Sequence, residues 1–210
     1  MIKIVIMGDG GHSKVVTDLV LASPNISLIA KLDDRHNKVF EEQGVIRGPV
    51  SYLKKILDPE IKLVFGIGSN QVRQDLAAKL GIPVASFISL VHPSAVISPS
   101  ASVGKGTVIM PGVVVNADAS IGDHVILNTG CVVEHDCVVG DYAHISPSAT
   151  LTGGVKIGEG AHVGAGASVI PLKAVGEWAA VGAGATVITD IPNRATAVGV
   201  PARVIRKEGI

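Results

Sequence analysis

An aliphatic residue recurs at every sixth position through the second half of the chain. The seventeen positions are Val91, Ile97, Val103, Ile109, Val115, Ile121, Leu127, Val133, Val139, Ile145, Leu151, Ile157, Val163, Val169, Val175, Val181 and Val187. A period of six matches neither the 3.6-residue period of an amphipathic helix nor the two-residue period of a half-buried strand. It predicts a parallel β-helix, in which each six-residue unit forms one short side and points its aliphatic residue inward. With three sides to a coil, the run holds between about five and six coils.

Small residues support this reading of the repeat. A glycine directly follows the inward residue at Gly104, Gly122, Gly140, Gly158, Gly164, Gly176 and Gly182. Aromatic residues, which are too bulky for a narrow interior, make up only 3% of the chain. Repeats of this kind also build purely structural proteins, so the repeat predicts a fold without deciding a function.

The first part of the chain has a different pattern. A buried strand over Ile2–Met7 is followed by a glycine loop at residues 8–13 and by a helical apolar pattern at residues 15–21. Further strands are expected at Ile26–Leu32 and Ile61–Phe65. This order predicts an α/β, Rossmann-like domain over residues 1–88, ahead of a β-helix domain over residues 89–210.

The glycine loop is a candidate phosphate site. Glycines let a backbone approach a pyrophosphate, and the amides at a helix N-terminus favour its negative charge. Ser13 stands where a dinucleotide fingerprint has its third glycine, so a plain tight turn is the alternative. Asp33 and Asp34, which end the second strand, can accept hydrogen bonds from a ribose or a base.

Charge and hydropathy exclude several partners. Lysine plus arginine and aspartate plus glutamate each number 18, so no basic field is available for a nucleic acid. No apolar run approaches the ~18 residues of a spanning helix, so membrane insertion is not expected. The N-terminus lacks the pattern of a signal peptide and the chain has two cysteines, which together indicate a reducing cytoplasm.

Cys131 and Cys137 fall on successive sides of a coil, so neither a disulfide nor a zinc pair is expected.

His135 is the strongest catalytic candidate among the histidines of the repeat. It lies between Glu134 and Asp136, and a carboxylate bonded to one ring nitrogen raises the basicity of the other. The alternative is a solvated polar corner without a catalytic role. His144 lies half a coil from His135, hence on another side, and His162 is expected to stack one coil above His144. His92 and His124 are expected at the surface.

Several segments together resemble one known family. They are the loop Gly8-Asp9-Gly10-Gly11-His12, Leu32-Asp33-Asp34, Ile67-Gly68-Ser69-Asn70, the hexapeptide repeat and the tail Gly199-Val200-Pro201-Ala202-Arg203. The family is that of the hexapeptide-repeat sugar acetyltransferases, which includes the bacillosamine-pathway UDP-4-amino-sugar N-acetyltransferase and the sialic acid O-acetyltransferase. The resemblance implies a left-handed β-helix, a homotrimer and acetyl-CoA as co-substrate.

The resemblance also implies residue roles. His135 would be the general base and Asp136 its orienting partner, with direct transfer in a ternary complex. The nucleotide sugar would contact Gly10, Gly11, His12, Asp33, Asp34, Gly68 and Asn128. Acetyl-CoA would contact His144, Gly164, Ala165, Gly182 and Ala183. Asp9 stands where the family has a small residue, which leaves the phosphate geometry open.

The acceptor is expected to be the amine of a UDP-4-amino-6-deoxy-hexose used in a surface glycan or exopolysaccharide. A sugar hydroxyl, as in sialic acid O-acetylation, remains an alternative, and UDP and CMP are not distinguished. Two readings from other classes are a non-catalytic nucleotide-sugar-binding scaffold and a zinc hydratase related to carbonic anhydrase. The chain lacks the closely spaced histidine pair of such a hydratase, and no metal is expected.

Overall fold

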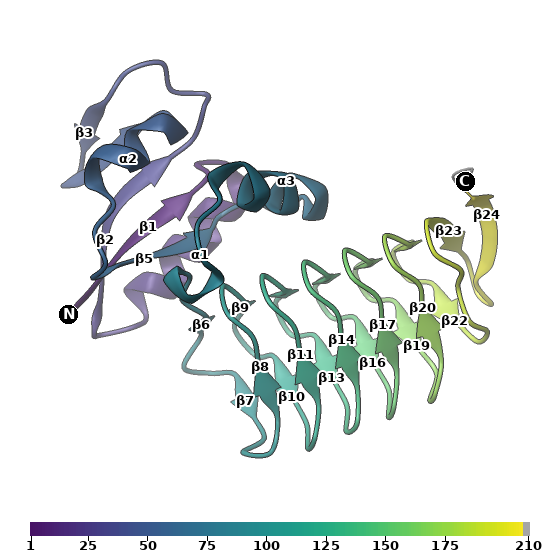
Figure 1. The fold of residues 1–210 in the computed structure, drawn as a ribbon. Helices are drawn as coiled ribbons and strands as arrows, with labels where there is room; N and C mark the ends of the chain where they lie inside the picture. Colours follow the sequence, from purple (N-terminus) through teal and green to yellow (C-terminus); the bar gives the residue numbers. More distant parts are fainter. Residues whose placement is uncertain (208–210) are drawn as a thin grey trace.

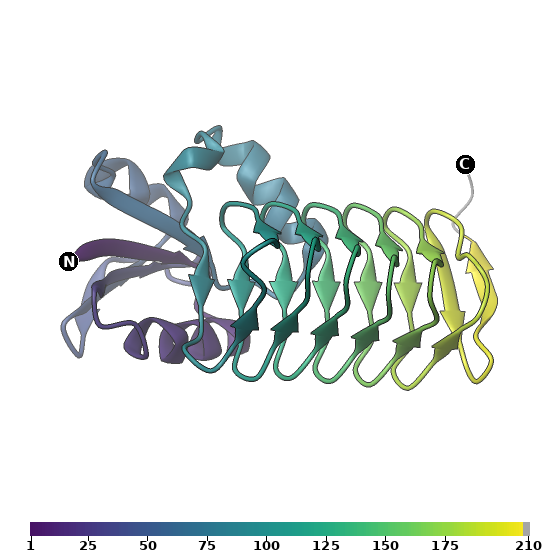
Figure 2. The same cartoon turned by 90° about the horizontal axis from the view of Figure 1, so that it is seen from below.

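A computed structural model describes residues 1–207, which form a small α/β region followed by a long parallel β-helix (Figures 1 and 2). The α/β region covers one end of the β-helix, and the C-terminal strands lie at the other end. No helix within residues 1–207 is long and apolar enough to cross a membrane.

The α/β region holds a five-stranded sheet in the order β3-β4-β2-β1-β5. Its elements are β1 Ile2–Met7, α1 Gly11–Leu21, β2 Ile26–Leu32, β3 Phe40–Glu42, β4 Val45–Gly48, the 3₁₀ turn Val50–Tyr52, α2 Leu53–Ile56, β5 Ile61–Phe65, α3 Asn70–Leu80 and the 3₁₀ turn Val84–Ser86. Strands β2, β1 and β5 are parallel and match the three expected strands, while the short hairpin β3–β4 was not predicted.

The β-helix consists of two-residue strands that stack into three sheets. The first sheet contains β7 Val96–Ile97, β10 Val114–Val115, β13 Val132–Val133, β16 Thr150–Leu151, β19 Ser168–Val169 and β22 Thr186–Val187. The second contains β8 Ser102–Val103, β11 Ser120–Ile121, β14 Val138–Val139, β17 Lys156–Ile157 and β20 Ala174–Val175. The third contains β6 Leu90–Val91, β9 Val108–Ile109, β12 Ile126–Leu127, β15 His144–Ile145, β18 His162–Val163, β21 Ala180–Val181, β23 Ala195–Val198 and β24 Arg203–Lys207.

The inward aliphatic positions form the core of the coils. From Ile109 to Val187 each of them is at most 3% exposed. The first coil departs from the pattern, since Val91 is 39% exposed and Ile97 and Val103 are only partly buried. These residues lie in the first coil, where each strand pairs with a strand of the next coil on one side only.

Glycines after the inward residues allow successive coils to approach. A β-carbon on Gly140 would lie 2.9 Å from the backbone carbon of Gly158, the equivalent glycine one coil later. Contact at that distance would force the two coils apart, so a side chain is excluded on steric grounds.

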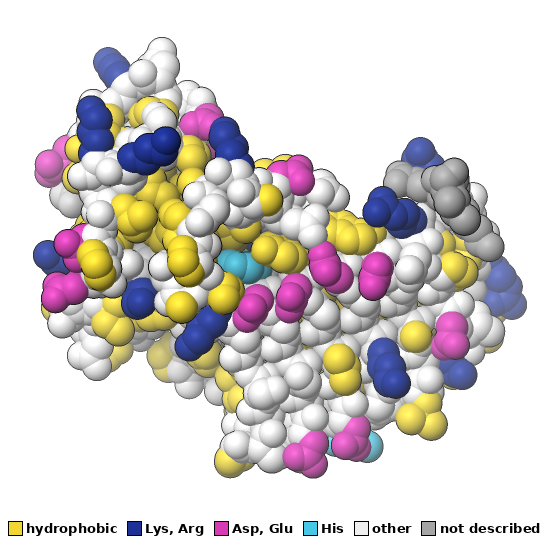
Figure 3. All heavy atoms as spheres, in the orientation of Figure 1, with side chains coloured by type: hydrophobic (Ala, Val, Ile, Leu, Met, Phe, Trp, Pro, Cys, Tyr) yellow, Lys and Arg dark blue, Asp and Glu magenta, His cyan; other side chains and the backbone are white. Residues whose placement is uncertain are grey.

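Acidic residues form a row along the coils beside α3 (Figure 3). Asp123 and Asp141 take part in it, and each accepts a hydrogen bond from a backbone amide of the preceding coil. The Lys105 amide donates to Asp123 at 2.6 Å, and the Asp123 amide donates to Asp141 at 2.8 Å. The acidic row therefore satisfies turn amides that would otherwise lack a partner.

Candidate functional site

A cavity of about 470 Å³ opens at the carboxyl ends of β1, β2 and β5. The predicted nucleotide-binding residues of the front region, Gly10, Gly11, His12, Asp33, Asp34 and Gly68, all line it. Helix α1 begins at Gly11, so its free amides and the positive end of its dipole face the cavity. The cavity can therefore hold an anionic group next to a sugar or base that is bonded to Asp33 and Asp34.

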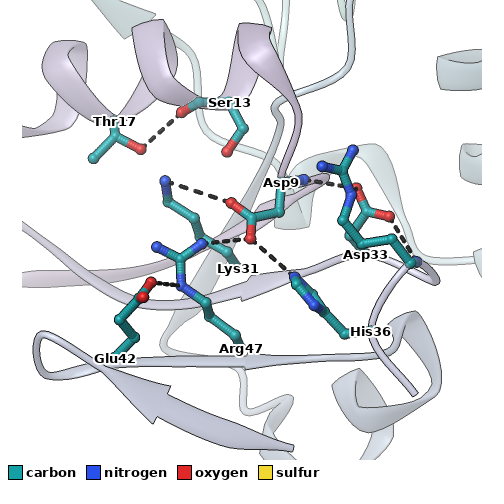
Figure 4. Close-up of polar contacts among 9 residues, drawn as sticks. Asp9, Ser13, Thr17, Lys31, Asp33, His36, Glu42 and Arg47 are labelled. Carbon is teal, nitrogen blue, oxygen red and sulfur yellow. Dashed lines mark hydrogen bonds and ion pairs between the residues drawn. The ribbon is translucent and has the colours of Figure 1, made fainter. Parts of the chain in front are cut away.

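The side chain of Asp9 does not line this cavity. Figure 4 shows it turned toward β2 and β4, where its carboxylate meets three basic side chains. It lies 2.9 Å from His36 Nε2 and 3.8 Å from Lys31 Nζ, and it also pairs with Arg47 Nη1. Hydrogen bonds from His36 and Arg47 outweigh the opposing effect of burial and lower the pKa of Asp9. The acidic side chain of the glycine loop is thus neutralised by basic side chains outside the cavity.

Asp9 also fixes the loop through its backbone, because its amide donates to Asp33 Oδ2 at 2.8 Å. We expect Asp9→Ala to remove the counterion of Lys31 and one of the two acidic partners of Arg47, and to destabilise the protein by about 2 kcal/mol or more. The variant keeps the Asp9 amide, but the loop that carries this amide loses its side-chain anchor on β2 and β4. Asp33 should then be held less firmly, so nucleotide-sugar binding should weaken. Thermal unfolding and titration with a nucleotide sugar test this, with the exposed Glu41→Ala as control. Wild-type stability and affinity in Asp9→Ala would contradict it.

His144 lies where the α/β region meets the coils. Asn128 Nδ2 is 3.0 Å from His144 Nε2, and the ring of His162 stacks on that of His144 with centroids 4.9 Å apart. His12, from the wall of the cavity, has its ring centroid 6.4 Å from that of His144. Burial is the main cause that lowers the pKa of His144 to about 3, so the ring is neutral at physiological pH. A neutral imidazole here can donate or accept one hydrogen bond but does not carry charge.

Buried histidines predict how stability depends on pH. Burial lowers the pKa of His12 and of His124 to about 4 each, and that of His144 to about 3. Between these values and about 6.5 the unfolded chain binds more protons than the folded protein, so stability rises with pH in that window. We expect the melting temperature to fall by several degrees from pH 7 to pH 5. His124→Phe should make the slope shallower, and a constant melting temperature over that range would refute the expectation.

His135 lies in the turn after β13 and is 62% exposed. Its Nδ1 is 2.8 Å from Asp136 Oδ2, and this hydrogen bond is the main cause that raises the pKa of His135. Nε2 is therefore the ring nitrogen that Asp136 does not occupy. His135 belongs to a corner next to the first sheet, whereas His144 belongs to the third, so one chain does not bring the two histidines together.

The four small residues predicted to contact acetyl-CoA lie in two stacked turns. The Gly164 amide donates to Val181 O at 2.8 Å, and the Gly184 amide donates to Ala165 O at 2.8 Å. A β-carbon on Gly164 would lie 2.6 Å from the Ala183 nitrogen. Gly164, Ala165, Gly182 and Ala183 thus form a continuous strip of small residues along the coils.

Two residues differ from the sequence-based interpretation. His124 was expected at the surface but is only 3% exposed, because Phe65 and Phe87 of the front region pack against its ring. Arg73 of α3 was not singled out, yet it is 1% exposed and its guanidinium donates to five backbone carbonyls on both sides of the domain boundary. The acceptors are the carbonyls of Ile67, Gly68, His124, Tyr142 and Ala143.

Both cysteines are free and buried in the coils. Burial raises the pKa of Cys131 to about 12, so its thiol stays protonated and cannot act as a nucleophile. The predicted stacking of His162 on His144 is confirmed. Within residues 1–207, no group of three or more histidine, cysteine or acidic side chains is placed to hold a metal ion.

Comparison with known proteins finds a matching family for each of the two parts of the chain. The PglD N-terminal domain family matches residues 3–80, and the bacterial transferase hexapeptide family matches residues 118–153 and 136–171. The structure of PerB from Caulobacter crescentus is 39% identical, covers 97% of each chain and superposes with a TM-score of 0.88. The chain belongs to the hexapeptide-repeat sugar acetyltransferase family.

Two further relatives support this family assignment. The acetyltransferase domain of PglB from Neisseria gonorrhoeae is 36% identical, with 98% of this chain and 100% of that chain covered and a TM-score of 0.87. A UDP-N-acetylbacillosamine N-acetyltransferase of Bacillus subtilis is 48% identical over 113 residues, which are 52% of each chain. The match thus spans about half the length of this curated relative. The expected fold class, a Rossmann-like region followed by a left-handed parallel β-helix, is confirmed.

Proposed function

We propose that the protein transfers the acetyl group of acetyl-CoA to an amino group of a nucleotide-linked sugar. The observation that carries this proposal is the continuity of the site. The cavity at the glycine loop reaches His12, whose ring lies 6.4 Å from that of His144 on the coils, next to the strip of small residues. PerB has been solved with CoA and GDP-perosamine, and the PglB acetyltransferase domain with acetyl coenzyme A. A chain of the same fold with this arrangement has room for both substrates.

In this proposal the nucleotide lies in the cavity. The amides at the start of α1 hold a phosphate, and Asp33 and Asp34 accept hydrogen bonds from the nucleoside. The glycines Gly10, Gly11 and Gly68 let the backbone approach the ligand, and His12 and Asn128 face the sugar. The sugar amine then points toward the coils, where the thioester of acetyl-CoA lies along Gly164, Ala165, Gly182 and Ala183.

His135 acts as general base in the proposed reaction. Its Nε2 removes a proton from the amine as the nitrogen attacks the thioester carbonyl, and Asp136 stabilises the imidazolium that forms. Hydrogen-bond donors around the neutral His144 ring stabilise the developing oxyanion. The carbon–sulfur bond then breaks and CoA leaves as the thiolate. Because both cysteines are buried, we favour direct transfer over an acyl-enzyme.

The proposed site needs two copies of the chain. His135 and His144 lie on different sides of one β-helix, so the base of one protomer would face His144 of the next across a shared groove. A closed cyclic trimer gives three equivalent grooves of this kind. We therefore propose a homotrimer as the active form.

An acetyl-transfer assay tests the proposed function. Purified protein should release CoA from acetyl-CoA with UDP-, GDP- or CMP-linked amino sugars, and mass spectrometry should show one added acetyl group that resists mild base, as an amide does. An ester product would instead indicate the hydroxyl acceptor of an O-acetyltransferase. Binding of nucleotide sugars without any CoA release would favour the scaffold alternative and contradict the proposal.

A further inference from the structure

Gly153 lies directly against the ring of His135. It follows β16 in the turn that stacks on the His135 turn, eighteen residues further along the chain. The Gly154 amide donates to His135 O at 2.9 Å, which holds the two turns together. A β-carbon on Gly153 would lie 2.7 Å from both Cε1 and Nε2 of His135. His135 Nε2, the ring nitrogen that is not bonded to Asp136, therefore lies against the α-carbon of Gly153. It fills the space that a side chain at position 153 would need.

The backbone does not require glycine at this position. The same place in neighbouring coils is taken by Pro99, Ala117 and Pro171, each of which carries a β-carbon. The left-handed residue of these turns is the next one along the chain, with φ of 60° at Asp136 and 69° at Gly154. The absence of a side chain at 153 is thus explained by the neighbouring ring and not by local conformation.

We propose that Gly153 is a positioning residue for His135. Asp136 holds the ring from the Nδ1 side, and the bare α-carbon of Gly153 leaves room for the Nε2 side to lie close against the next coil. Together they fix the direction in which Nε2 points into the groove. This inference rests on the proposed role of His135 as the base and adds the element that aims it.

Gly153→Ala should therefore impair catalysis without impairing folding. Because the His135 ring is exposed, it can swing away from the new methyl group at little cost in stability, but Nε2 then leaves its working position. We expect kcat to fall about 10- to 100-fold, the order of loss that a displacement of ~1 Å produces. KM for acetyl-CoA should stay within about twofold, since the strip of small residues proposed to hold it is unchanged in this variant. The melting temperature should be unchanged or slightly raised.

The pH profile supplies a readout that a purely structural role would not move. The ring must rotate to avoid the methyl group, which weakens its hydrogen bond to Asp136. Since that bond raises the pKa of His135, the acidic limb of kcat should shift to lower pH in Gly153→Ala. An unshifted limb together with a lower melting temperature would contradict the proposal.

A double-mutant cycle separates this inference from the proposed function. In a His135→Ala background no ring remains to be displaced, so adding Gly153→Ala should cause no further loss of kcat. A further loss of the same size as in the wild-type background would overturn the positioning role. If Gly153→Ala keeps wild-type kcat while His135→Ala is impaired, the inference is wrong and the proposed base stands. If His135→Ala keeps wild-type kcat, the proposed base is wrong, and Gly153 has nothing to position.

Discussion

Replacing His135 with alanine is expected to lower kcat by about 10²–10⁴-fold, the range of general-base contributions. The expectation follows from the geometry of the turn after β13. His135 Nδ1 is bonded to Asp136 and its Nε2 is left free, so the side chain has the form of an oriented base. Because the ring is 62% exposed and packs in no core, its removal should leave the melting temperature unchanged.

Two further variants sharpen this test. Asp136→Asn keeps the shape of the partner but removes its charge, so it should reduce kcat less than His135→Ala and should move the acidic limb of the pH profile to lower pH. His92→Ala serves as control and should keep wild-type kcat, because His92 is half-buried and its ring bonds to Ser94 in its own turn. Wild-type turnover in His135→Ala would remove the proposed base.

Replacing Arg73 with methionine is expected to give the largest loss of stability. The guanidinium is 1% exposed and donates to the carbonyls of Ile67 and Gly68 beside the cavity and to carbonyls of two successive coils, including Tyr142 O at 2.6 Å. Burial lowers the pKa of Arg73 to about 10, which still leaves it charged at neutral pH. Methionine fills part of the volume but leaves these buried carbonyls without a donor. Since a hydrogen bond to a charged group contributes about 1.5–3 kcal/mol, a cost of roughly 3 kcal/mol or more follows.

The form of unfolding should change as well. The neighbouring residues Asn70 and Gln74 of α3 also bond to the coils, at the Gly160 carbonyl and at Glu159, but they reach a single further coil. Without Arg73 the α/β region should unfold before the β-helix, so calorimetry should show two separated transitions. Gln71→Ala, on an exposed part of the same helix, should leave a wild-type profile. A single transition at the wild-type temperature in Arg73→Met would contradict the role of Arg73 in holding the α/β region to the coils.

The repeat made the β-helix predictable, because each six-residue unit contains its own inward residue and its own corner. The coil interior therefore followed from local pattern alone, except in the first coil, where Val91 is exposed and Ile97 and Val103 are only partly buried. The hairpin β3–β4 was missed because its strands are short and β3 is exposed on every residue, so no alternation of polarity marks it.

Contacts between the two regions could not be predicted in the same way. The hexad position of His124 places it on the outside of the coil, where Phe65 and Phe87 of the other region and Tyr142 of the next coil bury it. Arg73 has the sequence appearance of a solvated helix charge, because its partners are carbonyls, which every residue has. Asp9 was visible as an exception in the glycine loop, but its three basic partners come from later strands and loops. The proposed sharing of a site between protomers depends on how the chains assemble, which the structure of one chain does not contain.

Subunit complementation tests the shared site most directly. His135→Ala and His144→Ala chains, each expected to be nearly inactive alone, would be co-expressed in equal amounts and purified as mixed oligomers. If each site combines His135 of one protomer with His144 of the next, random trimers contain intact sites, and about one quarter of wild-type activity should return. If the mixed oligomers remain as inactive as the single variants, each site lies within one chain and the shared groove is contradicted.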